Sequence, residues 1–131
     1  TDLLVDSVPF MEQDGRIQTC SSVAIWSSTT TMAHCFDFPA YTTSEVMGRA
    51  TRTLAGERVG PTQGLDYEQM MLALRDMGYD TLMLWEKDKT RAIHAIYSYV
   101  ESGIPPILLL QLPSGTGHAV VALGHGHKRP F

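Results

Sequence analysis

Cys20 is the residue of this sequence whose type and setting best suit covalent chemistry. It stands in the stretch QTCSSVAIW, after a polar, Gly-containing approach and before a run of small side chains. A helix is expected to begin at or near it, and the N-terminus of a helix favours the negative charge of a thiolate nucleophile. The competing interpretation is a small buried structural thiol, which is what most free cysteines are.

A thiolate mechanism also needs a base, and histidine titrates closest to neutral pH. His118 directly follows the turn PSGTG and opens a predicted strand, which puts an imidazole on a rigid element at the rim of a sheet. His94 is expected as a partly buried structural residue and His34 as a solvent-facing one, while His125 and His127 stand near the end of the sequence. His118 is therefore the candidate general base.

Acyl transfer further requires donors for the developing oxyanion. The backbone N–H of Cys20 is one, and the side-chain amide of Gln13 or Gln18 is a candidate for the other. The second cysteine, Cys35, is followed by Phe36 and is interpreted as a packing residue. Both cysteines are expected to be free thiols, because two cysteines on one helix have poor geometry for a disulfide.

Hydrophobic periodicity and helix-start signals predict the elements that would position these side chains. Expected helices run from Cys20 toward His34, over 42–54, over 66–77 and over 88–102; expected strands cover 3–10, 79–85, 106–112 and 118–124. Thr42 with Glu45, and Asp66 with Gln69, have the spacing of capping boxes. Strands 106–112 and 118–124 are expected to pair as a hairpin.

Two helices carry an apolar face that is expected to be buried. The predicted faces are Tyr67, Met70, Met71, Leu74 and Met77 on one helix, and Ala92, Ile93, Ile96 and Val100 on the other. Because helices dominate the first part of the chain and strands the last, the order predicts an α+β fold with helices on one side of a mostly antiparallel sheet.

The segments QTCSSVAIW, GLDYEQMMLALRDMGY, AIYSYVESGIPPILLLQL and GTGHAVVALGHG occur in that order, and the chain resembles the papain-like cysteine peptidases. Within them it is most similar to the short bacterial, C39-like branch, and the similarity covers residues 9–126. The resemblance implies one papain-like α+β domain over residues 1–131, with the nucleophile helix packed on a C-terminal antiparallel sheet. It also implies a peptide or protein substrate, cleaved at a peptide or other amide bond.

Residue by residue, the resemblance makes Cys20 the nucleophile, His118 the general base and Gln13, ahead of Gln18, the oxyanion donor. No cofactor is expected. The family orients its histidine with an Asp or Asn on the following strand, and no Asp or Asn follows His118. The orienting residue therefore stays open, as does truncation at the C-terminus within a larger protein. Peptidase and acyltransferase remain alternatives, because both use this machinery.

Three other functions compete with catalysis. One is a degenerate domain of the same fold that binds peptide or protein partners without cleaving them. Another is a metal site built from His118, His125 and His127, with or without Cys35, although the sequence contains no HExxH or CxxC motif. The third is an interaction domain that uses the methionines at 70, 71 and 77, a stripe that more often belongs to a core.

Composition excludes several classes. A hydrophobic content of 44% and a charged content of 18% indicate a globular chain rather than a disordered one. A net charge of -4 without a Lys/Arg cluster argues against nucleic acid. No apolar run approaches the roughly 18 residues of a membrane span, and no signal peptide is visible, so the compartment stays open.

Overall fold

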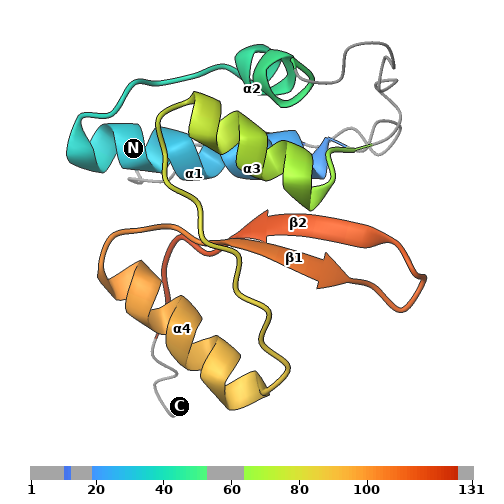
Figure 1. Cartoon of the computed structure of the whole chain (residues 1–131). Helices are drawn as coiled ribbons and strands as arrows, with labels where there is room; N and C mark the ends of the chain where they lie inside the picture. Colours follow the sequence, from blue (N-terminus) through green and yellow to red (C-terminus); the bar gives the residue numbers. More distant parts are fainter. Residues whose placement is uncertain (1–10, 13–18, 53–63, 127–131) are drawn as a thin grey trace, which may run out of the picture.

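The computed structural model describes residues 11–12, 19–52 and 64–126. These ranges form four helices and two strands: α1 (Cys20–Phe36), α2 (Thr43–Ala50), α3 (Tyr67–Asp76), α4 (Lys89–Glu101), β1 (Ile107–Gln111) and β2 (Gly117–Val121). The helices α1, α2 and α3 lie together on one side of the β1–β2 hairpin, and α4 lies on the other side (Figure 1). The expected α+β class is therefore observed.

The helix α1 forms despite a Ser/Thr content that disfavours helices by propensity. Several of its hydroxyl groups donate hydrogen bonds to backbone carbonyls one turn earlier in the helix. Thr29 Oγ1, for example, donates to the carbonyl of Ile25 at 2.9 Å. Two others connect α1 to its neighbours. The N–H of Leu65 donates to Ser21 Oγ at 2.9 Å, and Ser28 Oγ donates to the Pro105 carbonyl at 2.8 Å. The polar residues of α1 therefore join distant segments.

Both predicted capping boxes are present. In α2, Thr42 and Glu45 exchange side-chain and backbone hydrogen bonds, and in α3 Asp66 and Gln69 do the same. Each box pairs N–H groups that a helix start leaves without intrahelical partners. The predicted stop at Gly78 is also confirmed, since its φ of 92° lies in the region that glycine tolerates best.

One hydrophobic cluster joins α1, α2, α3 and β2. Its buried members are Ala24, Ile25, Val46, Ala50, Leu65, Met70, Ala73, Met77 and Ala119. On α3 the prediction is right for Met70 and Met77, which are buried, whereas Tyr67 is 43% exposed. The methionine stripe therefore belongs largely to the core, as such stripes usually do.

The two strands pair as the predicted hairpin, antiparallel and in the register Ile107–Val121, Leu109–Ala119 and Leu110–His118. Ala119 is buried in the cluster, and Ile107 and Val121 pack against it. Because side chains alternate along a strand, these residues mark the hairpin face that points toward α1.

Three expectations about the second half of the chain are wrong. Residues 79–85 form no strand, and Leu82 and Trp85 are 71% and 78% exposed. No residue of α4 is buried, and Ile93 of its predicted inner face is 52% exposed. The described helices do not all lie on one side of the sheet (Figure 1). An apolar segment becomes a strand only where another strand offers hydrogen-bond partners, and the described segments offer none to 79–85.

Candidate functional site

Cys20 is the first residue of α1, as predicted. It is a free thiol, partly buried, and packs against the edge of the hydrophobic cluster. The preceding residue, Thr19, makes no side-chain cap, and the first turn of α1 contains no acidic residue. The sulfur is thus attached where unpaired N–H groups and the helix dipole favour negative charge.

His118 is the second residue of β2 and is half-buried. The strand β2 packs against α1, so the two elements that carry Cys20 and His118 are in contact. Figure 1 shows the start of α1 and the turn between β1 and β2 toward the same side of the molecule. The fold therefore brings together the elements that the sequence analysis selected.

The two side chains themselves are not joined. No hydrogen bond links Cys20 to His118 in the described part of the chain. Strand alternation also places His118 on the same hairpin face as its partner Leu110, opposite to the face of Ala119 that meets the helices. For His118 to accept the Cys20 proton, its imidazole must move past the end of β2 to the hairpin face that meets α1.

Gln13 and Gln18, the candidate oxyanion donors, lie outside the described residues, as do His127 and the strand expected over 3–10. Of the donors considered, the backbone N–H of Cys20 has a defined place, at the first position of α1. That N–H has no intrahelical partner by the rule for helix starts, so it is suited to an oxyanion.

The other cysteine and histidines have clear positions. Cys35 is exposed, so the prediction that it packs is wrong. His34 is exposed as expected, but His94 is exposed rather than partly buried. His94 lines a shallow hollow of about 410 Å³ together with Ile93, Tyr97 and Ser98.

His125 connects the segment after β2 to α4. Its Nε2 pairs with the carboxylate of Glu101, and its ring lies 4.7 Å from that of Tyr97, centroid to centroid. These contacts matter because α4 packs against no other helix or strand in the described part of the chain.

Among residues 11–12, 19–52 and 64–126, no three or more His, Cys, Asp or Glu side chains gather closely enough to hold a metal ion. Within the same ranges, no helix is both long and apolar enough to cross a bilayer.

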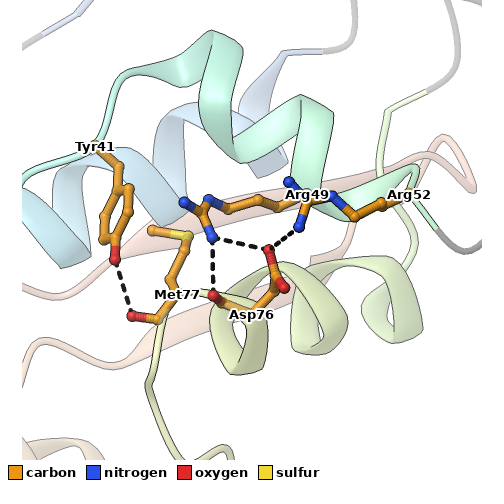
Figure 2. Close-up of polar contacts among 5 residues, drawn as sticks. All are labelled: Tyr41, Arg49, Arg52, Asp76 and Met77. Atoms are coloured by element: carbon orange, nitrogen blue, oxygen red, sulfur yellow. Dashed lines mark hydrogen bonds and ion pairs between the residues drawn. The ribbon is translucent and has the colours of Figure 1, made fainter.

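A cluster that the sequence analysis missed lies where α2 and α3 end (Figure 2). Arg49 Nη1 donates to both the carbonyl and the carboxylate of Asp76 at 2.8 Å. Arg52 Nη1 reaches the same carboxylate oxygen at 3.3 Å. The Arg49 guanidinium also lies 4.9 Å from the centre of the Tyr41 ring, whose hydroxyl donates to the Met77 carbonyl. In the sequence, the signal for a basic cluster was an arginine in the last turn of each helix, Arg49 in α2 and Arg75 in α3.

The pKa values of Glu45 and of Tyr79, which lie near these helices, are shifted. Hydrogen bonds from the backbone and side chain of Thr42 lower the pKa of Glu45, because they favour its charged form. Burial, followed by the influence of Tyr41, raises the pKa of Tyr79. The Tyr79 hydroxyl is buried without a hydrogen-bond partner in the described structure, and neither group belongs to the Cys20 region.

Comparison of the chain with protein-family models, curated proteins and solved structures found no match.

Proposed function

We propose that this protein is a cysteine-dependent hydrolase that cleaves a peptide or other amide bond through Cys20 and His118. The observation that carries the proposal is the start of α1 at Cys20, with α1 packed against the strand that bears His118. Thiolate chemistry needs a thiol at such a helix start and a histidine base that can reach it, and the contact between α1 and β2 supports both. The resemblance to papain-like peptidases supports the same assignment.

The reaction follows from these groups. His118 accepts the Cys20 thiol proton, and the thiolate attacks the amide carbonyl carbon to form a C–S bond. The Cys20 N–H, assisted by Gln13 or Gln18, stabilises the oxyanion. His118 then protonates the leaving amine as the C–N bond breaks. Water, deprotonated by His118, hydrolyses the thioester and releases the acid and the thiol. If an amine replaces water, the same steps give acyl transfer.

The proposal requires His118 to approach Cys20 when substrate binds. His118 is next to Gly117 and close to Gly115, whose φ is 83°, so the adjoining backbone has few side chains to restrict it. Catalytic hydrogen bonds are often long before substrate binds and tighten in the complex.

One observation favours a second function, in which the same domain binds a peptide or protein without cleaving it. His118 shares its hairpin face with Leu110 and makes no hydrogen bond to Cys20 within the described residues. An imidazole kept on that face would leave Cys20 without a base.

Cleavage of a diverse peptide mixture, followed by mass spectrometry, tests the proposal. The wild-type protein and the Cys35→Ser control should generate the same new termini, because Cys35 is exposed and has no role in the reaction. Cys20→Ala should generate none, and His118→Ala should slow cleavage by about a hundredfold or more. Cleavage that persists in Cys20→Ala contradicts the proposal. Peptide binding without cleavage in the wild type supports the second function.

A further inference from the structure

The surface where α2 and α3 end contains a hollow of about 320 Å³ with an unusual charge. Arg49, Arg52, Arg75, Asp76 and Leu72 line it. The lining holds three guanidinium groups and one carboxylate, and a further carboxylate, on Glu45, interacts with Arg49. The lining is therefore positive, although the chain as a whole has a net charge of -4. A hollow of this charge on an acidic protein is suited to an anion.

Contacts with the described residues occupy only some of the donors of these arginines. The carboxylate of Asp76 receives one terminal nitrogen each from Arg49 and Arg52 (Figure 2). Arg75 uses its Nε to donate to Thr81 Oγ1 at 2.9 Å. Because a guanidinium has five N–H donors, each arginine keeps several that no described residue occupies.

Asp76 holds two of these groups in position. Its carboxylate oxygen is shared by Arg49 and Arg52, which brings two guanidinium groups close together. Such an arrangement is prepared for a planar or tetrahedral oxyanion before the ligand arrives, and arginine binds oxyanions through paired hydrogen bonds.

Compensation of helix dipoles explains only part of the cluster. Arg49 and Arg75 stand in the last turns of α2 and α3, where positive charge is favourable. Arg52 lies beyond the end of α2, and its side chain is 68% exposed. Its presence on the same carboxylate gives the hollow more positive charge than the helix ends require.

We propose that this hollow binds a phosphate monoester. Such a group has a charge of about -1.5 to -2 at neutral pH, which suits a lining of three guanidinium groups and one carboxylate. A single carboxylate would bring only about half the charge of a phosphate monoester. The inference does not depend on Cys20 and goes beyond the proposed hydrolase activity.

Nuclear magnetic resonance titration of the whole chain at pH 7.5 and fixed ionic strength tests this site. The probes are inorganic phosphate, a phosphoserine peptide, and the same peptide with glutamate or serine. Inorganic phosphate and the phosphoserine peptide should each give saturable shifts in residues 49–52 and 72–76. Tighter binding of the peptide would identify a phosphopeptide, and equal binding would identify free or small-molecule phosphate.

Matched arginine variants complete the test. Arg52→Gln and Arg75→Gln should each weaken phosphate binding by about tenfold, as expected from the loss of one charged hydrogen bond. Arg91→Gln removes the same charge from the exposed start of α4 and should bind like the wild type. Thermal unfolding verifies that each variant is folded, and Arg52, the most exposed, provides the safest change.

Three results overturn the proposal: no saturable shift with phosphate, equal weakening by Arg91→Gln, or binding of the glutamate peptide as tight as that of the phosphoserine peptide.

Discussion

At the scale of single residues, the serines of α1 determine how the helix is attached to the rest of the protein. Serine has a low helix propensity, so these residues do not favour the helix by local preference. The structure shows that Ser28 bonds to the carbonyl of Pro105, which is 77 residues away in the sequence. No local pattern contains that partner, so this role was beyond sequence analysis, whereas the helix start at Cys20 was predictable.

Ser28→Ala should lower the free energy of unfolding by about 1–3 kcal/mol, because it leaves the Pro105 carbonyl without its donor in a buried setting. Urea unfolding measures this loss. Ser27→Ala is the matched control, since Ser27 is half-buried and its hydroxyl makes no hydrogen bond in the described structure. An equal loss in both variants would show that the bond to Pro105 is not the cause.

Glu45 gives the capping box of α2 a dependence on pH. Its pKa is lowered by hydrogen bonds from Thr42, so its carboxylate is held more strongly in the folded state than in the unfolded chain. That stability is present above the unfolded pKa of about 4.3 and is lost as the pH falls through the lower folded pKa.

Glu45→Gln should therefore reduce the acid sensitivity of the protein. The drop in melting temperature between pH 6 and pH 3 should be smaller in the variant than in the wild type, as measured by circular dichroism. An unchanged drop would indicate that the box works equally well with a protonated side chain.

At the scale of elements, prediction succeeded where the cause is local. The capping boxes of α2 and α3 and the turn of the hairpin each depend on residues within a few positions of one another. Prediction failed for the strand over 79–85 and for the inner face of α4. Whether these segments are paired or buried depends on parts of the chain that are distant in the sequence. In the described chain the hairpin and its helices form one core, and α4 remains outside it.

The attachment of α4 should consequently be weak and depend on His125. Replacing His125 with alanine removes the pair with Glu101 and the contact with the Tyr97 ring. Amide hydrogens of α4 should then exchange roughly twofold to tenfold faster, the effect expected for a partly exposed ion pair with ring contact, while those of α1 stay unchanged.

The control for α4 is His34→Ala, which changes an exposed histidine on α1. It should leave exchange in α4 as it is in the wild type. Equal exchange of α4 in His125→Ala and the wild type would show that other contacts hold this helix. One such contact is between Gly103, just after α4, and Phe36, the last residue of α1. A Cβ added at Gly103 would lie 3.1 Å from Phe36 Cζ, so the backbone of Gly103 lies close to the Phe36 ring.

At the scale of the whole molecule, the sequence predicts which elements meet but not the direction in which the side chains of those elements point. The spacing of segments along the chain placed Cys20 at a helix start and His118 on the second strand of a hairpin, and both placements are observed. The side on which His118 projects depends on strand register and on which face the core covers. Register is a property of the assembled fold, and a single segment does not reveal it.

The arginine hollow was missed for the same reason. Arg49, Arg52 and Arg75 stand apart in the sequence, and only the packing of α2 against α3 places them around one hollow with Asp76. The absence of a Lys/Arg run correctly described the sequence but did not exclude a small basic site made from two helices.

Alkylation of Cys20 by iodoacetamide at pH 6 tests the central claim most directly. In a Cys35→Ser background Cys20 is the one thiol, since the chain contains two cysteines. An ordinary thiol reacts slowly at this pH because little of it is thiolate. If His118 serves Cys20, the rate should be about tenfold or more above that of the same protein with His118→Ala. Equal rates in the two proteins would contradict the account.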